Sequence, residues 1–70
     1  MFALNEMTAR FASFATAADC AVKHAQQRGE CKLRTRGGLL LADFVRQADG
    51  TVSVYGVCEG KKMVEDWAAY

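Results

Sequence analysis

The chain of 70 residues contains no proline, one histidine and only three cysteines, and these shortages limit what it can be. The cysteines form no CxxC pair, so they fit a reducing cytosol better than a secreted disulfide framework. No apolar run is long enough to cross a bilayer. The N-terminal MFALNEMTAR has an early acid and lacks a basic region followed by an apolar run, which argues against a secretory signal. We therefore expect a cytoplasmic protein that contacts no membrane.

Signatures of catalysis are missing as well. The eight acidic residues are scattered and give no paired-carboxylate pattern for acid–base work. The glycines mark turns and form neither a GxGxxG nor a GxxxxGK[ST] phosphate loop. His24, the one histidine, has no obvious orienting acid, and so small a domain offers little room for a cleft that excludes water. We predict that the protein is not an enzyme and has no cofactor.

A zinc site is the one alternative that the cysteines offer. Four residues could formally serve as zinc ligands: Cys20, His24, Cys31 and Cys58. Cys20 and His24 lie four residues apart on one face of a predicted helix. Their spacing matches no zinc-ribbon or zinc-finger pattern, and unpaired cysteines commonly serve as small buried hydrophobes. We predict no metal site, with this set as the alternative.

Size and charge set further limits. No linker, repeat or low-complexity segment divides the chain, so we expect a single domain over residues 1–70. The net charge of +1 gives no argument for nucleic acid, so any electrostatic case must rest on local clustering. The core of such a short chain is small, and its stability is marginal without oligomerisation. A homodimer is therefore one expectation.

The segment from Glu30 to Cys58 contains three predicted strands joined by two tight turns. Gly37-Gly38 suits a two-residue hairpin loop, because glycine adopts the positive φ angles that such a turn requires. Ala48-Asp49-Gly50 suits a three-residue loop with Gly50 in the left-handed conformation, since a two-residue loop would turn the polar residues of the third strand inward. This register places the following residues on the core face: Cys31, Leu33, Leu40, Ala42, Phe44, Val52, Val54, Gly56 and Cys58.

The opposite face is predicted to be basic along one edge and apolar in the middle. Its residues are Lys32, Arg34, Arg36, Leu39, Leu41, Asp43, Val45, Ser53, Tyr55 and Val57. Apolar patches on small monomers tend to be interaction sites, so either the C-terminal segment or a partner should cover this one. The alternative is a solvated edge whose charge prevents strand pairing. The candidate partner contacts are Lys32, Arg34, Arg36, Leu39, Leu41, Tyr55 and Val57.

One main helix is predicted before these strands. Thr16 is a candidate N-cap, Ala15 could pack against Cys20 across the helix start, and the helix should run to about Arg28 and stop at Gly29. Its small apolar stripe allows close packing on the sheet; it consists of Ala18, Ala21, Val22 and Ala25.

The two ends of the chain are less determined. Residues 1–11 fit either an edge strand or a helical stripe, and we favour a strand or irregular arm. Residues 59–70 place Met63, Trp67 and Tyr70 on one face of a short C-terminal helix, with a tail or a fourth strand as alternatives. The predicted fold class is α+β: one main helix on a three-stranded antiparallel meander, with a fourth strand and a short C-terminal helix left open.

The order of a helix followed by the meander RTRGGLLLADFVRQADGTVSV resembles very small phage and mobile-element proteins, including type I anti-CRISPR inhibitors. The likeness covers roughly residues 16 to 58 and concerns size, element order and turn placement. It implies a non-enzymatic inhibitor that occupies a surface of a protein or ribonucleoprotein complex. The contact candidates would be Lys32, Arg34 and Arg36.

A second resemblance is to double-stranded RNA-binding domains, in which three strands precede a helix that begins with paired lysines. The segment Gly60-Lys61-Lys62-Met63-Val64 is similar to that helix start, and Leu4-Asn5-Glu6 is similar to part of the first helix. It implies that Lys61 and Lys62 face phosphates of a nucleic acid. The first turn, Arg36-Gly37-Gly38, lacks the proline and histidine of those domains, and the helix predicted from Thr16 lies elsewhere.

Overall fold

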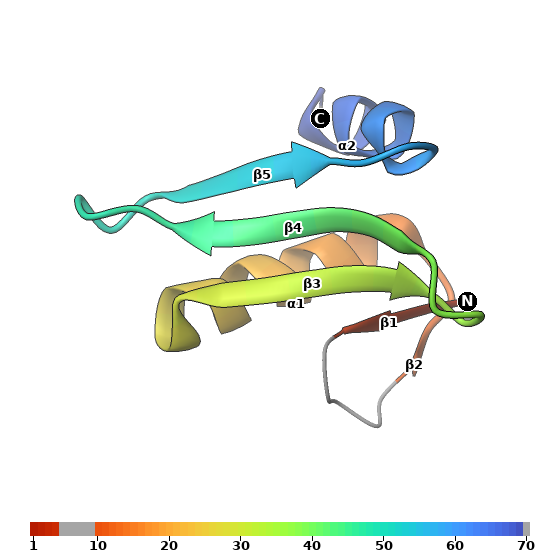
Figure 1. Cartoon of the computed structure of the whole chain (residues 1–70), viewed down its shortest axis with the longest axis horizontal. Coiled ribbons are helices and arrows are strands. Elements are labelled where there is room, and N and C mark those ends of the chain that lie inside the picture. The colour runs from red at the N-terminus through yellow and green to blue at the C-terminus, as the bar shows by residue number, and fades with distance from the viewer. Residues whose placement is uncertain (5–9, 70) are drawn as a thin grey trace.

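A computed structural model describes residues 1–4 and 10–69, which form an α+β fold with a five-stranded antiparallel sheet and two helices. The chain order is β1 (Phe2–Leu4), β2 (Arg10–Phe11), α1 (Phe14–Arg28), β3 (Glu30–Thr35), β4 (Leu40–Arg46), β5 (Val52–Gly56) and α2 (Gly60–Ala68). The strands lie in the order β2-β1-β3-β4-β5 (Figure 1). The predicted meander is confirmed as β3, β4 and β5, and the two extra strands come from the N-terminal segment.

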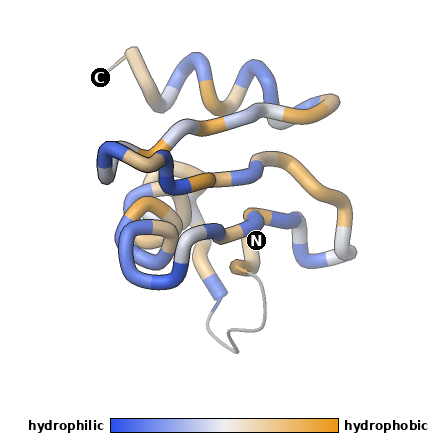
Figure 2. Tube along the Cα trace, turned by 60° about the vertical axis from the view of Figure 1, so that its left-hand side comes forward, coloured by the Kyte–Doolittle hydropathy of each residue, from blue (hydrophilic) through white to orange (hydrophobic). Residues whose placement is uncertain are grey.

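Both helices lie on the same side of the sheet. Helix α1 crosses behind β3 and β4 in Figure 1, and in Figure 2 it is seen nearly end-on while α2 runs beside β5. The buried core lies between α1 and the sheet; its residues are Leu4, Ala17, Ala18, Ala21, Ala25, Cys31, Leu33, Leu41, Ala42 and Phe44. Four alanines on α1 let the helix backbone come close to the strands, as the predicted stripe requires.

Helix α1 begins three residues earlier than predicted. Ser13 is the N-cap, with extended backbone angles, and its Oγ accepts the Thr16 N–H at 3.5 Å, so the prediction of Thr16 as the cap is wrong. Ala15 is therefore an exposed residue of the first turn and does not pack across the helix start. Phe14 fixes this start by an edge-to-face contact with Phe2 of β1, at a centroid separation of 5.7 Å. At the other end, Gly29 stops the helix as predicted, in a left-handed conformation.

The first hairpin differs from the prediction by one residue. The Thr35 N–H donates to the Leu39 carbonyl, and Gly38 has a φ of 96°, so the loop contains three residues, Arg36 to Gly38. That loop alone would shift every later pair of β3 and β4 by one. A β-bulge at Leu41 restores the register, so Leu33 faces Ala42 and Cys31 faces Phe44 as predicted.

The three-residue loop and the bulge change the faces of three leucines. Leu39, predicted to lie on the outer face with Arg36, is instead opposite Thr35, which pairs with Phe2 on the helix side of the sheet. Leu40, predicted to lie in the core, pairs with Arg34 and is half-buried on the other side of the sheet. Leu41, predicted to lie outside, is completely buried. The physical reason is that the three-residue loop moves the side chains between the turn and the bulge to the face opposite to the predicted one. At the bulge, Leu41 and Ala42 both lie opposite Leu33, so the side chains from Ala42 onward return to their predicted faces.

The second hairpin follows the prediction. Gln47 and Thr51 close a three-residue loop, with a Gln47 N–H to Thr51 carbonyl distance of 2.7 Å and Gly50 at a φ of 89°. Val52 and Val54 pack against the core as expected. Cys58 does not, because β5 ends at Gly56 and Cys58 is an exposed turn residue with a φ of 51°.

The predicted C-terminal helix is confirmed as α2. Its Trp67 packs edge-to-face on the core residue Phe44 at 6.0 Å, which ties α2 to the same side of the sheet as α1. Leu4, placed in a first helix by the second resemblance, lies instead in β1. Asn5, Glu6 and Tyr70 lie outside the described residues.

Candidate functional site

The side of the sheet opposite the helices is termed the open face. Strand pairing places Lys32 between Arg34 and Glu30 on β3 and opposite Asp43 of β4, which in turn faces Tyr55 of β5. The open face consists of Ala3, Glu30, Lys32, Arg34, Leu40, Asp43, Val45, Ser53 and Tyr55. Neither helix covers it, since both pack on the core side (Figure 1). The C-terminal segment, as far as it is described, therefore does not shield this surface.

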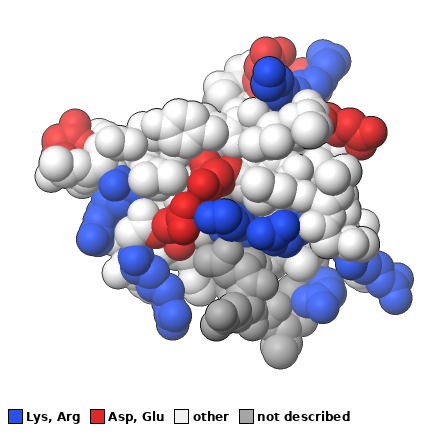
Figure 3. Space-filling model, viewed as in Figure 1, with Lys and Arg blue, Asp and Glu red and all other residues white. Residues whose placement is uncertain are grey.

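The centre of the open face carries a charge network rather than a row of cations. Lys32 Nζ lies 2.9 Å from Glu30 Oε2 and 3.7 Å from Asp43 Oδ2. The hydrogen bond from Lys32 lowers the pKa of Glu30, and the same bond raises the pKa of Lys32. Acidic and basic side chains accordingly lie side by side across the middle of this face in Figure 3. The predicted basic row of β3 is neutralised at its midpoint.

Asp43 is the least solvated member of the network. Its Oδ1 is buried and has no hydrogen-bond partner among residues 1–4 and 10–69. Burial raises the pKa of Asp43, and a hydrogen bond shared with Glu30 adds to the rise, while Lys32 opposes it. The surroundings therefore favour the protonated form of Asp43 and the ionised form of Glu30, relative to the same groups in water.

Positive charge gathers at the turn end of the open face. Arg34 Nη1 donates to the Gly38 carbonyl at 3.2 Å, so its guanidinium bends toward the first hairpin loop. Arg36 is an exposed residue of that loop, and its backbone N–H donates to the Met1 carbonyl. Leu39 is 49% exposed beside them. Arg34 and Arg36 therefore make the turn end of the open face basic, and Leu39 is exposed in the same hairpin tip on the helix side.

The remaining predicted contact residues separate into accessible and inaccessible ones. Tyr55 is 54% exposed in the middle of β5, and Val57 is half-buried just after that strand. Leu41 has no exposed surface and is removed from the candidate surface. A substitution of Leu41 would test the fold and not the binding.

The four formal zinc ligands do not come together. Cys31 is buried in the core, Cys20 is half-buried on α1 and Cys58 is exposed in the turn before α2. Within the described part of the chain, no group of three or more histidine, cysteine or acidic side chains is arranged to hold a metal ion. Also within these residues, no helix has the length and apolar character needed to span a membrane.

Lys61 and Lys62 lie in the first turn of α2, and both are exposed. Lys62 Nζ is 3.4 Å from Asp66 Oδ1 one turn later, and the two side chains are 80% and 65% exposed. Such an exposed pair is weak and leaves the lysine able to exchange partners.

Comparison of the chain with protein-family models, with curated proteins and with solved structures of known proteins gave no match. The site is therefore defined by its own geometry.

Two features of that geometry were not predicted. The Lys32–Asp43 pair could have been predicted from the sequence, because the predicted register of Leu33 with Ala42 places these two side chains opposite each other. The hydrogen bond from Trp67 to Asp19 had no such signal, since 48 residues separate the two.

Proposed function

We propose that this chain is a small non-enzymatic binding protein that acts by occupying a surface of a host nucleic-acid-processing complex. It would be an interaction or inhibitor module of the phage or mobile-element type, as the resemblance to anti-CRISPR proteins implies. The observation that carries the proposal is the open face, a sheet surface that neither helix covers.

The chemistry of the open face favours a protein surface as its partner. Tyr55 offers a large, half-exposed ring with a polar end, a side chain enriched in protein interfaces. Val45 and Leu40 add partly exposed apolar area on the neighbouring strand. Glu30 and Asp43 lie beside Lys32 at the centre, and this mixed charge suits a protein partner of mixed charge better than a phosphate backbone.

The hairpin tip adds a basic edge to this surface. Arg34 and Arg36 would pair with acidic side chains of the partner, and the exposed Leu39 would fill an adjoining apolar pocket. An arginine at the rim of an interface mainly governs the association rate, whereas a buried aromatic ring mainly governs affinity. Arg34 and Tyr55 therefore probe different parts of the same contact.

Quantitative affinity capture from host extract tests the proposal. We expect Arg34→Glu and Tyr55→Ala each to lose the protein complex that the native chain enriches, while the fold is retained by circular dichroism. Lys23→Glu is the matched control, because Lys23 is an exposed cation on α1, behind the sheet. Equal enrichment by the native chain and by both open-face variants would refute the proposal. A self-association that both variants abolish, measured by sedimentation, would identify the partner as a second copy.

Direct binding of RNA or DNA is the second candidate, and one observation favours it. Helix α1 is followed by three antiparallel strands and then by α2, whose first turn carries Lys61 and Lys62. Three strands followed by a lysine-led helix are the order that the resemblance to double-stranded RNA-binding domains implies, although that resemblance placed the first helix at Leu4-Asn5-Glu6 and not at α1.

Binding to a short RNA duplex at low salt tests this second candidate. We expect micromolar affinity that falls steeply with salt, as phosphate contacts require. The double variant Lys61→Ala, Lys62→Ala should weaken binding and reduce the salt dependence, while Lys23→Ala should not. Absence of duplex binding at low salt would eliminate the candidate and leave the open-face proposal unaffected.

A further inference from the structure

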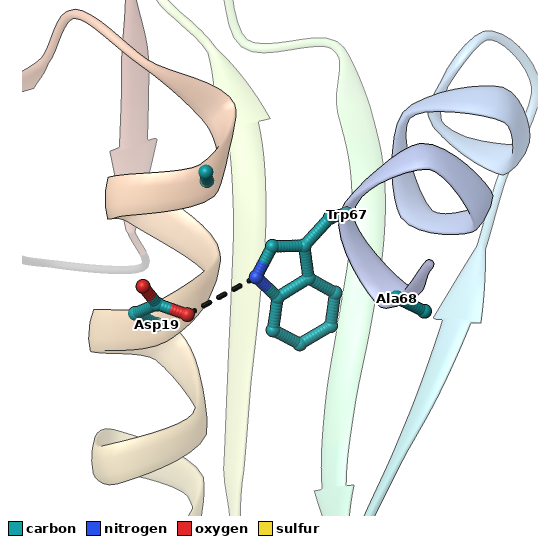
Figure 4. A pocket seen from close by; sticks show the side chains of 4 residues that line it. Asp19, Trp67 and Ala68 are labelled. Carbon is teal, nitrogen blue, oxygen red and sulfur yellow. Dashed lines mark hydrogen bonds between the residues drawn. The ribbon is translucent and has the colours of Figure 1, made fainter. Parts of the chain in front are cut away.

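A cleft separates the two helices on the side of the molecule opposite the open face. It consists of two hollows that share Ala15 and Trp67. The larger, of about 410 Å³, is lined by Ala15, Asp19, Trp67 and Ala68. The smaller, of about 220 Å³, is lined by Ser13, Phe14, Ala15, Met63, Asp66 and Trp67. Figure 4 shows the larger hollow, with the indole of Trp67 reaching from α2 toward α1; both hollows together are termed the helix cleft.

Trp67 is held in a fixed orientation in this cleft. Its Nε1–H donates to Asp19 Oδ1 at 3.1 Å (Figure 4), and its ring makes an edge-to-face contact with Phe44 in the core. The indole is thus anchored at both ends and lies between the two hollows. Its orientation does not have to be fixed when a ligand binds, which lowers the entropic cost of binding.

The larger hollow is negatively charged. Asp19 is exposed and accepts the neutral indole N–H of Trp67. Within the described residues, no cation forms an ion pair with it. The carboxyl end of α2 borders the same hollow through Trp67 and Ala68, and the last turn of α2 contains no basic residue. The unsatisfied carbonyl groups at a helix end carry partial negative charge, which adds to that of Asp19.

The smaller hollow has a different character. Phe14 and Met63 contribute apolar surface from α1 and α2, and both are half-buried against the core. Its acid, Asp66, already has Lys62 as an ion-pair partner at 3.4 Å. The helix cleft therefore combines a site for positive charge at Asp19 with an adjoining site for an apolar side chain.

We propose that the helix cleft binds a segment of a partner protein through one lysine or arginine side chain with an apolar neighbour. The cation would lie beside the Asp19 carboxylate, whose Oδ1 is hydrogen-bonded to Trp67, and next to the indole, which attracts positive charge through its ring face. The apolar neighbour would fill the smaller hollow between Phe14 and Met63. The site lies on the helix side of the sheet, so it is independent of the open face and of the function proposed for that surface.

Two short peptides test the proposal directly, one of leucine and lysine and one in which each lysine is replaced by glutamate. The indole N–H signal of Trp67, the one tryptophan, is followed by NMR during each titration. We expect a saturable shift with the lysine peptide that weakens at high salt, and none with the glutamate peptide. A shift that depends on protein concentration without any peptide would show a second copy in the cleft and overturn the proposal.

Substitutions then assign the charge. Asp19→Asn keeps an oxygen to accept the Trp67 N–H and removes the charge, so affinity for the lysine peptide should fall about fivefold. Glu65→Gln is the matched control, because Glu65 is an exposed acid of α2 that does not line the cleft. An equal response to both peptides, or an unchanged affinity of a folded Asp19→Asn variant, would overturn the proposal.

Discussion

The contact between the start of α2 and the bulge of β4 makes Gly60→Ala a decisive substitution. Gly60 is buried, and a Cβ at this position would overlap the carbonyl group of Leu41 and lie 2.7 Å from its Cα. Leu41 cannot move aside easily, because its carbonyl accepts the Val57 N–H at 2.9 Å and its side chain is completely buried. The strain must therefore be relieved by moving α2 away from the sheet.

The expected cost follows from this geometry. Overpacking costs about 1–3 kcal/mol, and because the overlapping atoms are backbone we expect about 3 kcal/mol of unfolding free energy. In a domain of this size each kcal/mol corresponds to about 4–8 °C, so the melting temperature should fall by about 12–24 °C. Movement of α2 would also separate Trp67 from Phe44 and Asp19. Thermal unfolding by circular dichroism measures the first effect, and tryptophan fluorescence reports the second.

Gly37→Ala is the control for the Gly60 substitution. A Cβ on Gly37 would have the Thr35 Oγ1 at 3.8 Å as its nearest neighbour, an ordinary contact in an exposed turn. This variant should unfold within about 0.5 kcal/mol of the native chain, as neutral surface changes do. If Gly60→Ala proved as stable as Gly37→Ala, the close packing of α2 on the bulge would be wrong.

Three further predictions concern the helix cap, the thiols and the open face. Ser13→Ala should cost about 1 kcal/mol in urea unfolding and Thr16→Ala clearly less, because Ser13 accepts the N–H of Thr16; equal losses would contradict the cap. The exposed Cys58 should react with a thiol reagent in the native state. Burial raises the pKa of Cys31 to about 11, so Cys31 should react only after unfolding. Equal reaction rates of the two thiols in the native state would contradict the placement of Cys31 in the core. Because burial raises the pKa of Asp43 above its usual 3.8, its protonated form stabilises the fold; that contribution is complete below pH 3.8 and is lost as pH rises through the folded-state pKa. Asparagine does not titrate, so as pH rises from 3.8 through the folded-state pKa, the melting temperature of the native chain should fall relative to that of Asp43→Asn. A difference between the two melting temperatures that did not change with pH would refute the assignment.

The sequence predictions were accurate where a structural feature is determined by neighbouring residues, and inaccurate where it depends on contacts between distant elements. Gly29 and Gly50 were placed correctly, because a helix stop and a three-residue loop are determined by a few neighbouring residues. The pair Gly37-Gly38 is compatible with loops of two or three residues. The choice depends on the bulge at Leu41, which is stabilised by contacts with α2 and is not visible in the turn sequence.

The helix start shows the same limit. Ser13 and Thr16 are both good capping residues, and local preference does not separate them. The contact of Phe14 with Phe2 selects the earlier start, because it requires Phe14 to lie in the first turn beside β1. Residue periodicity cannot reveal a contact between two elements whose relative position is set only when the sheet forms.

The placement of both helices on one side divides the molecule into two surfaces with different chemistry. The open face presents Tyr55 with a nearly neutral charge network, and the helix cleft presents Trp67 with an acid that no described cation neutralises. The sheet and its core lie between them, so substitutions on one surface share no direct contact with the other. Their effects on binding should then add independently. A partner whose binding is weakened by Tyr55→Ala and by Asp19→Asn to the same extent would have to contact both sides, which a single flat surface cannot do.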